Sequence, residues 1–220
     1  MIARQLIIES IPPIGPEESG INALRMMDEL RVSQLPIVKD EEFTGLISDT
    51  DILNLNNFTE AIGKNPLSLS NAYVRENQHI YDVIRLFDSM KLDILPVLDE
   101  KGHYIGSITL GSLIHAVSGM MALDNPGGII ILEINDKDYL LTEIAQIVES
   151  NDAKILGMYI TTYPDSTRMD VTLKVNRIDV GAILQTFVRY NYIIKASFSE
   201  DTYTESLKER FDSLMNYLNI

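Results

Sequence analysis

LPIVKDEEFTGLISDTDIL, at residues 35–53, has a near copy in LPVLDEKGHYIGSITLGSLI at residues 95–114. Each copy has a Leu-Pro pair, a short apolar run and a polar turn, followed by a glycine and, three residues later, a serine or threonine. Residues 23–38 also align on residues 83–98 with a constant offset of 60. Beyond the strand the offset is 61, so Ser48 matches Thr109. Such an internal repeat predicts two copies of one structural unit.

Each copy is expected to fold as helix, strand, turn, strand and helix. Apolar residues recur at helical spacing from Ala23 to Leu30, and Ser19 can cap this helix. A strand is predicted to begin at Pro36, followed by a polar turn over residues 39–45 and a second strand from Leu46. A unit with such short strands buries too little apolar surface alone, so the two copies are expected to share a core.

The composition sets limits on the function. The 220 residues include no cysteine, which excludes disulfides, thiolate metal sites and a cysteine nucleophile. Acidic residues outnumber basic ones by 32 to 18, and the net charge of −14 disfavours binding to nucleic acid or anionic membranes. Because there is no apolar run of a membrane span or signal peptide, the chain is expected to stay in the cytoplasm.

The pair Ser48 and Asp51 has the spacing of a helix cap. The Ser48 hydroxyl can cap a helix that begins near Thr50, while the Asp51 carboxylate reaches back to the backbone N–H of Ser48. Glu or Gln is the usual residue in the second role. In the other copy these positions are Thr109 and Ser112, so the carboxylate is missing there.

On these residues the chain resembles the CBS-domain family, paired regulatory modules named after cystathionine β-synthase. The resemblance covers roughly residues 1–123 and rests on the doubled LPIV and LPVL strands, the glycine and hydroxyl residue after each, and Asp51. In the family the hydroxyl holds a phosphate, and the Asp accepts both ribose hydroxyls of an adenine nucleotide. The resemblance therefore implies that Ser48 and Asp51 bind AMP, ADP, ATP or a related adenosyl compound, as a regulatory ligand and not as a cofactor. Capping alone remains the alternative.

In such pairs, the pocket of one motif is completed by the segment that leads into the other repeat. Carried over by position, the walls of the Ser48/Asp51 pocket are Ala72, Tyr73, Val74, Leu92, Asp93 and Ile94. A weaker second pocket joins Thr109 and Ser112 to Ile11, Pro12, Pro13, Ile14 and residues 32–34. Asp93 stands where tight phosphate binders of the family often have His or Arg, so it is expected to repel phosphate. Tyr73 suits ordinary strand packing as well as an adenine wall.

The pattern changes after the turn-rich residues 120–128. Strands are predicted at residues 128–134, 155–162, 169–175 and 192–198, with one helix over residues 140–148 and another capped by Asp179. The order βαββαβ predicts a split βαβ, ferredoxin-like sandwich. The fold class is therefore α/β (α+β), with a CBS-domain pair of small sheets flanked by helices and a C-terminal ferredoxin-like domain.

This last part resembles the ACT domain family, small regulatory folds that often bind amino acids at dimer interfaces. DKDYLL at residues 136–141 sits where the family commonly has D-x-P-G-x-L, and AKI at residues 153–155 where it has A-N-I. Tyr139 replaces the loop glycine that would let backbone approach a ligand, and Asp138 replaces the proline. Amino-acid binding and simple dimerisation or packing both remain open. A CBS pair followed by an ACT-like domain is similar to the bacterial acetoin-utilisation accessory proteins, which implies regulation.

The expected domains are CBS repeat 1 at residues 1–63, CBS repeat 2 at 64–123, the ACT-like domain at 124–198 and a C-terminal amphipathic helix at 199–220. In that helix, apolar residues recur at spacings of 4, 3 and 4, at Leu207, Phe211, Leu214 and Leu218. The helix is expected either to pack on its own domain or to contact a second copy across a dimer.

The sequence shows no motif of an enzyme. It has no Gly-rich phosphate loop, no H-E-x-x-H and no G-x-S-x-G, and its three histidines have no metal-ligand spacing. We therefore expect neither a catalytic residue nor a metal site. The expected function is a ligand sensor that passes a change to a homodimer partner or to a client enzyme or transporter. A constitutive interaction protein with lapsed sites and an amino-acid sensor are the alternatives.

Overall fold

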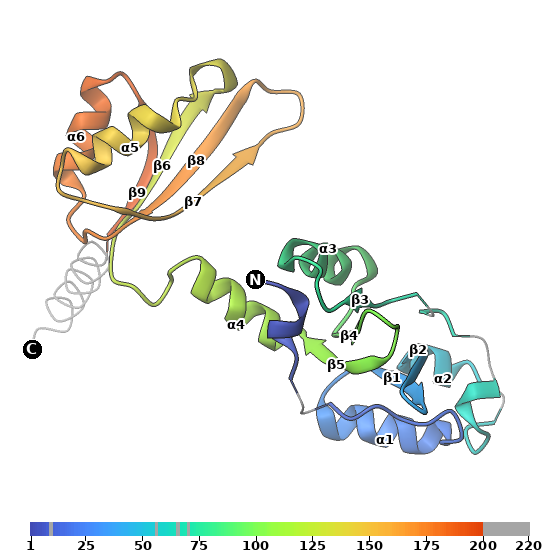
Figure 1. Ribbon diagram of the computed structural model, residues 1–220. Helices are drawn as coiled ribbons and strands as arrows, with labels where there is room; N and C mark the ends of the chain where they lie inside the picture. Colours follow the sequence, from blue (N-terminus) through green and yellow to red (C-terminus); the bar gives the residue numbers. More distant parts are fainter. Residues whose placement is uncertain (9–10, 56, 65–66, 70, 200–220) are drawn as a thin grey trace, which may run out of the picture. The chain divides into compact units, whose positions relative to one another are not determined.

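The computed structural model describes residues 1–8, 11–55, 57–64, 67–69 and 71–199. The chain divides into two compact units, Met1–Ala116 and Val117–Ile220 (Figure 1). A C-terminal helix was predicted at residues 199–220. Of these, residues 200–220 lie outside the described residues.

The first repeat has the predicted order of elements. It contains α1 (Gly20–Leu30), β1 (Gln34–Lys39), β2 (Glu42–Ser48) and α2 (Asp49–Leu53). Ser19 caps α1 as predicted, because its hydroxyl accepts the N–H of Asn22 at 3.3 Å.

The turn between β1 and β2 is much shorter than the predicted residues 39–45. Only Asp40 and Glu41 join the strands, with φ of 49° and 70°. Positive φ at both central residues is the geometry of a tight two-residue hairpin. Phe43 therefore belongs to β2 and not to the turn, which corrects the prediction.

The second repeat follows the same plan. After the short β3 (Val74–Arg75) come α3 (Ile80–Met90), β4 (Ile94–Leu98), β5 (Tyr104–Thr109) and α4 (Leu110–Met120). Both α1 and α3 span 11 residues, and they end at Arg31 and Lys91 in the left-handed conformation. Because Arg31 and Lys91 are 60 positions apart, the sequence repeat extends to the backbone of the helix ends.

The two repeats meet at equivalent positions. The backbone N–H of Ser33 donates to the Asp93 carboxylate at 3.0 Å, and these residues are 60 apart. At the hairpin tips, Glu42 pairs with His103, which is 61 positions later. Contacts between matching residues are the mark of a two-fold interface. The repeats therefore face each other about a local two-fold axis.

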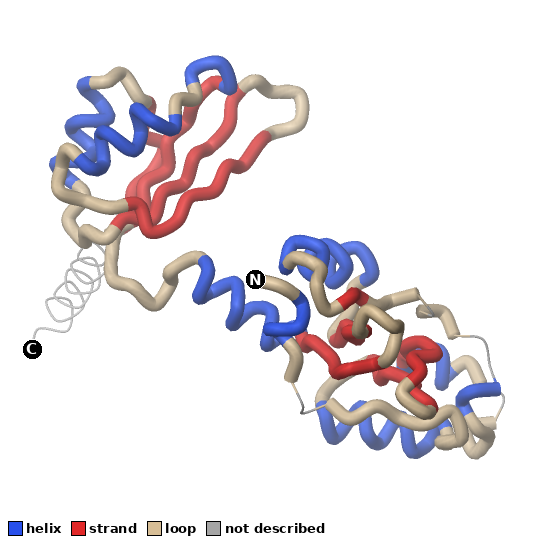
Figure 2. Tube along the Cα trace, in the orientation of Figure 1, coloured by secondary structure: helices blue, strands red, loops and turns tan. Residues whose placement is uncertain are grey.

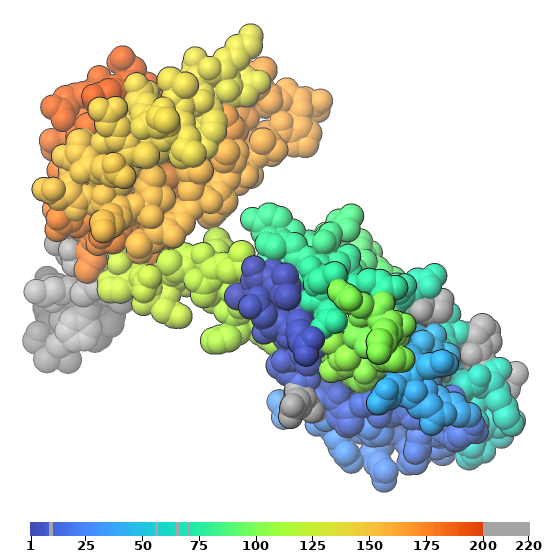
Figure 3. Space-filling view, in the orientation of Figure 1, coloured from blue at the N-terminus to red at the C-terminus, as the bar shows by residue number. Residues whose placement is uncertain are grey.

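The repeats also exchange their leading segments. Ile8, which precedes α1 in the first repeat, donates its N–H to the carbonyl of Ser107 on β5 at 3.0 Å. Leu46 on β2, the equivalent of Ser107, donates to the carbonyl of Leu69, which precedes α3 in the second repeat, at 3.2 Å. Figure 3 shows the dark blue N-terminal surface directly against the green surface of the second repeat. Each copy is therefore completed by chain that leads into the other.

The core of this unit draws on both copies, as predicted. Ile94 of the second repeat is buried together with Leu35 and Ile37 of the first. Among the described residues, the buried cluster consists of Ile11, Ile14, Ala23, Met27, Leu35, Ile37, Ile47, Ile52, Ile62 and Ile94.

The second unit has the predicted ferredoxin-like arrangement. Its elements are β6 (Ile129–Asn135), α5 (Leu141–Glu149), β7 (Ile155–Thr162), β8 (Arg168–Val175), α6 (Gly181–Arg189) and β9 (Ile193–Phe198). The sheet order is β7-β8-β6-β9, and all neighbours are antiparallel. Each strand lies within one residue of its predicted bounds. Asp179 acts at the start of α6, where its carboxylate accepts the N–H of Gly181 at 2.8 Å.

Both helices of this unit cover the same face of the sheet (Figures 1 and 2). Residues from α5 and α6 pack with alternate residues of β6 and β8 in a buried cluster. Its strand members are Ile130, Leu132, Ile134, Val171, Leu173 and Val175, and its helix members are Ile144, Ile147, Val148, Ile183 and Phe187.

The exchanged N-terminal segment makes a testable packing contact with Gly106. This glycine has φ of 144°, and Ile7 occupies the space where a Cβ would stand. The Gly106→Ala variant should lower the free energy of unfolding by about 1–3 kcal/mol, measured by urea denaturation. Gly119→Ala is the control: no atom lies within 4 Å of its added Cβ, so its stability should be equal or higher. An unchanged stability of Gly106→Ala would contradict the observed packing.

Candidate functional site

Ser48 and Asp51 form a reciprocal cap at the start of α2. The Ser48 hydroxyl accepts the N–H of Asp51, and the Asp51 Oδ2 atom accepts the N–H of Ser48, each at 3.0 Å. These bonds satisfy two N–H groups that a first helical turn leaves free. The capping half of the prediction is therefore present, with the helix beginning at Asp49.

Thr109 and Ser112 form the same cap at α4 without a carboxylate. The Thr109 hydroxyl accepts the N–H of Ser112, and the Ser112 hydroxyl accepts the N–H of Thr109, each at 3.1 Å. A serine thus makes both hydrogen bonds of the cap at the position where the first repeat has Asp51. Capping alone does not require a carboxylate at this position.

The carboxylate of Asp51 is only partly engaged. Its Oδ2 atom accepts the Ser48 N–H and, in addition, the Ser68 hydroxyl at 3.0 Å. Among the described residues, no hydrogen bond reaches the second oxygen, Oδ1. Asp51 is half-buried, so this oxygen can accept a hydrogen bond from a hydroxyl of a small molecule.

Ser68 was not predicted to be part of this site. It lies in the segment that leads into the second repeat, and the exchange of leading segments brings it to Asp51. The corresponding residues before the first repeat have a different sequence, so the repeat alignment gave no indication of this contact.

The predicted walls of the first pocket lie in two environments. The side chains of Ala72, Val74, Leu92 and Ile94 are buried within the unit. Tyr73 is half-buried, and its ring edge meets Phe43 with centroids 6.0 Å apart. Tyr73 therefore makes the kind of packing contact expected of an ordinary core or strand residue. The role of all these residues as walls of a ligand pocket remains a prediction.

Asp93 binds across the local two-fold axis. Its Oδ2 atom accepts both the N–H and the hydroxyl of Ser33, and its own N–H donates to the Gln34 side chain at 3.1 Å. Ser33 and Asp93 are also hydrogen-bonded to the first residues of α2 and α4, the two capped helices. Asp49 N–H donates to the Ser33 carbonyl, and Leu110 N–H donates to the Asp93 carbonyl, at 2.9 and 3.1 Å. Ser33 and Asp93 therefore lie between the two candidate sites.

The residues proposed for the second pocket are also divided. Ile11 and Ile14 are buried in the shared core, and Ile14 bonds through its backbone to Pro36 and Val38 at 2.9 Å. Pro12 and Pro13, between them, are exposed. Ligand binding by this set, together with Thr109 and Ser112, remains a prediction.

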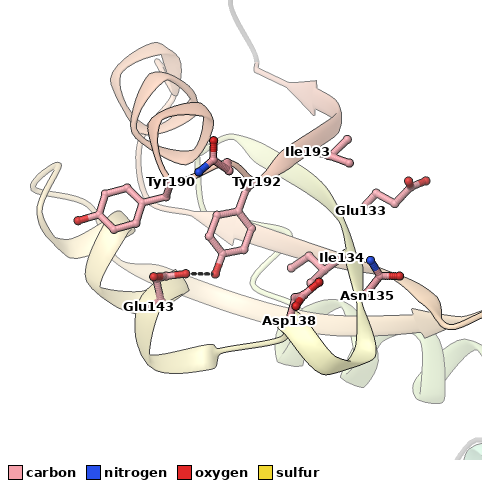
Figure 4. Close-up of a pocket in the computed structure, with 9 residues that line it drawn as sticks. Glu133, Ile134, Asn135, Asp138, Glu143, Tyr190, Tyr192 and Ile193 are labelled. Atoms are coloured by element: carbon pink, nitrogen blue, oxygen red, sulfur yellow. Dashed lines mark hydrogen bonds between the residues drawn. The ribbon is translucent and has the colours of Figure 1, made fainter.

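The second unit contains a pocket of about 310 Å³ beside the loop that follows β6 (Figure 4). Tyr192 points toward Glu143 and donates its hydroxyl to the carboxylate at 2.7 Å. Burial and this carboxylate raise the pKa of Tyr192 above its ordinary value, so the phenol remains a neutral donor. The lining residues are Glu133, Ile134, Asn135, Asp138, Glu143, Tyr190, Asn191, Tyr192 and Ile193.

Tyr139, at the position of the ACT loop glycine, packs against the core of the second unit. Within the described ranges, the pocket lining contains three carboxylates and no Lys, Arg or His. In the same ranges no cluster of His, Asp and Glu is suited to hold a metal ion, and no helix is long and apolar enough to cross a membrane.

Comparison with known proteins gives matches for the first unit. The CBS domain family matches residues 3–56 and 65–119. Inosine-5′-monophosphate dehydrogenase of Thermoplasma acidophilum is 29% identical over 115 residues, covering 50% of this chain and 22% of the relative. The chain thus spans about a quarter or less of the length of the curated relatives it matches.

Two crystal structures resemble about half of the chain. A CBS domain pair/ACT domain protein from Thermotoga maritima is 20% identical, with a TM-score of 0.50, over 54% of this chain and 98% of that chain. CBSX2 of Arabidopsis thaliana in complex with AMP is 25% identical, with a TM-score of 0.48, over 54% and 96% of the two chains. The family match, together with the doubled fold, shows that the N-terminal part of this chain is a tandem pair of CBS domains.

Proposed function

We propose that the CBS pair is a regulatory module that binds one adenine nucleoside or nucleotide at Ser48 and Asp51. The observation that carries the proposal is the difference between two otherwise matching caps. Ser112 makes both hydrogen bonds of its cap, whereas Asp51 makes the same bonds and its Oδ1 atom has no hydrogen-bond partner among the described residues. A carboxylate oxygen is a stronger acceptor for a ribose hydroxyl than a serine hydroxyl, because its hydrogen bonds are charge-assisted.

The charges at this site favour a ligand with few phosphates. Asp49 and Asp51 both lie in the first turn of α2, and Asp93 is nearby through Ser33. Among the described residues, none of these three carboxylates forms an ion pair with Lys or Arg. Like charges repel, so adenosine and AMP should bind better than ATP in the absence of Mg²⁺.

Ser68 provides a route from ligand to structure. Its hydroxyl shares Asp51 Oδ2 with the cap, and it belongs to the exchanged segment that joins the repeats. A ligand held by Asp51 would therefore stabilise the arrangement in which this segment is docked. The shift is limited to the difference in ligand affinity between docked and undocked states. A dimer partner or a client protein would read this shift.

The pocket of the second unit supports amino-acid binding less well. It lies beside residues 136–138, where the ACT resemblance implies a ligand, and its carboxylates suit an ammonium group. The described lining offers no cationic side chain for the carboxylate that every amino acid also carries.

The cap can be separated from the ligand role by two substitutions at one position. Asp51→Ser should reproduce the cap of Ser112 and change the free energy of unfolding by less than about 0.5 kcal/mol, whereas Asp51→Ala should lower it by about 0.5–2 kcal/mol. Urea denaturation of the ligand-free proteins measures both. Equal losses in the two variants would show that serine cannot replace aspartate in this cap.

Ligand binding should depend on the carboxylate itself. In a thermal-shift panel of adenosine, AMP, ADP, ATP, S-adenosylmethionine, NADH and common amino acids, an adenine compound at 100 times its dissociation constant should add about 2.7 kcal/mol. Asp51→Ser should weaken its affinity about 10- to 100-fold, because charge-assisted hydrogen bonds contribute about 1.5–3 kcal/mol. Ser112→Asp, the matched control in the other copy, should not weaken it.

The absence of a thermal shift with every adenine compound would contradict the proposal. A shift with amino acids alone would place the function in the second unit.

The homodimer that we propose predicts a mass of about 50 kDa, twice the chain mass of 24.8 kDa, in light scattering at micromolar concentration. A mass of one chain would rule out transmission through a dimer and leave only a client protein.

A further inference from the structure

The sheet of the second unit has one face that its helices do not cover. Residues 130, 132 and 134 of β6 point into the core, so the alternate residues Ile129, Ile131 and Glu133 point to the opposite face. Cross-strand pairing extends this face to both edges of the sheet. Its apolar members are Ile129, Ile131, Tyr159, Ile193, Ala196 and Phe198.

This face, called here the open face, carries large apolar side chains that are exposed to water. Ile193 and Phe198 are 59% and 56% exposed, and Tyr159 is 49% exposed. At one corner of the open face, the backbone carbonyl oxygen of Met121 lies 3.6 Å from the place that a Cβ of Gly157 would take. Exposed apolar side chains gathered on one face of a sheet mark a site of contact with another segment or molecule.

Four of the charged side chains on the open face form ion pairs, while Lys174, opposite Ile129, donates to the carbonyl of Gly127 at 3.4 Å. Lys195 donates to Asp170 at 2.6 Å, and Arg168 donates to Glu133 at 2.7 Å. Asp170 is only 7% exposed, although it projects from the side of the sheet without helices. Pairing lowers the cost of removing charges from water. The open face is thus suited to being covered.

We propose that residues 204–218 of this same chain form a helix that covers the open face. The chain continues for 22 residues after Phe198, the last residue of β9, and β9 is an edge strand whose Phe198 and Ala196 belong to the face. The covering stripe consists of Leu207, Phe211, Leu214 and Leu218, whose spacing places them on one side of a helix.

The lengths agree with this arrangement. A helix over residues 204–218 is about 22 Å long, close to the roughly 20 Å of β9 and the roughly 23 Å of β6. The five residues 199–203 span up to about 17 Å, enough to reverse direction and cross the roughly 10 Å between a sheet and a helix packed on it. The end of the helix, near Leu214 and Leu218, then lies toward Ile193 at the start of β9.

The full-length chain offers a direct test because it contains no cysteine. Ile193→Cys places a single thiol on the open face, and Val188→Cys places one on the outer side of α6. Both residues are 59% exposed, so they form a matched pair. The rate of reaction with a thiol reagent is measured for each and divided by its own rate in urea.

The proposal predicts that the thiol of Ile193→Cys reacts about tenfold or more slowly than that of Val188→Cys, as expected for burial worth about 1.4 kcal/mol. Adding Phe211→Glu and Leu214→Glu should raise the reaction rate of the Ile193→Cys thiol to that of the Val188→Cys thiol. The rate of Val188→Cys itself should not change. Asn216→Glu, which falls on the opposite side of the predicted helix, should leave the protection in place.

Equal rates at the two positions would overturn the proposal. So would protection that survives the double substitution, since another part of the protein would then cover the face. Protection that is lost on dilution would also overturn it, because a second copy, and not the tail of the same chain, would be the occupant.

Discussion

The hydrogen bond between Ser33 and the Asp93 carboxylate joins the two repeats of the first unit at equivalent positions. These residues occupy the same position in the two repeats, so a two-fold arrangement brings them face to face. Two aspartates here would repel each other, and two serines would form a weaker, uncharged contact. Divergence of the repeats at this position therefore stabilises their pairing. The exchanged leading segments then complete each copy with chain from the other.

The elements of the fold could be predicted because their signals are local. Apolar spacing identified α5 and the strands β6 to β9 to within one residue, and the order βαββαβ indicated the ferredoxin-like sheet. The Asp40-Glu41 hairpin was predicted too long, because two non-glycine residues with positive φ are uncommon. Asp93 was expected to repel a phosphate, and its bond to Ser33 could not be foreseen because it depends on how the copies face each other.

Part of the candidate site was predictable because its sequence signal is also local. The spacing of Ser48 and Asp51 indicated both a cap and a ligand site, and the structure shows the cap. Ser68 escaped prediction because it reaches Asp51 through the segment exchange, and the counterpart of its segment in the other repeat has a different sequence. The comparison that carries the functional proposal, between Asp51 and Ser112, depends on distances in both copies. The two caps make matching hydrogen bonds, and within the described part of the chain the first copy also has a carboxylate oxygen, Oδ1 of Asp51, without a hydrogen-bond partner.

Calorimetric titration of the wild-type chain and the Asp51→Ser variant with AMP tests the central claim most directly, because it reports stoichiometry as well as affinity. If the carboxylate decides which copy binds, the wild type should take up one AMP per chain, and Asp51→Ser should bind it at least about tenfold more weakly. Two equivalent sites per chain, or one site whose affinity is the same in both proteins, would contradict the assignment of the ligand to Asp51.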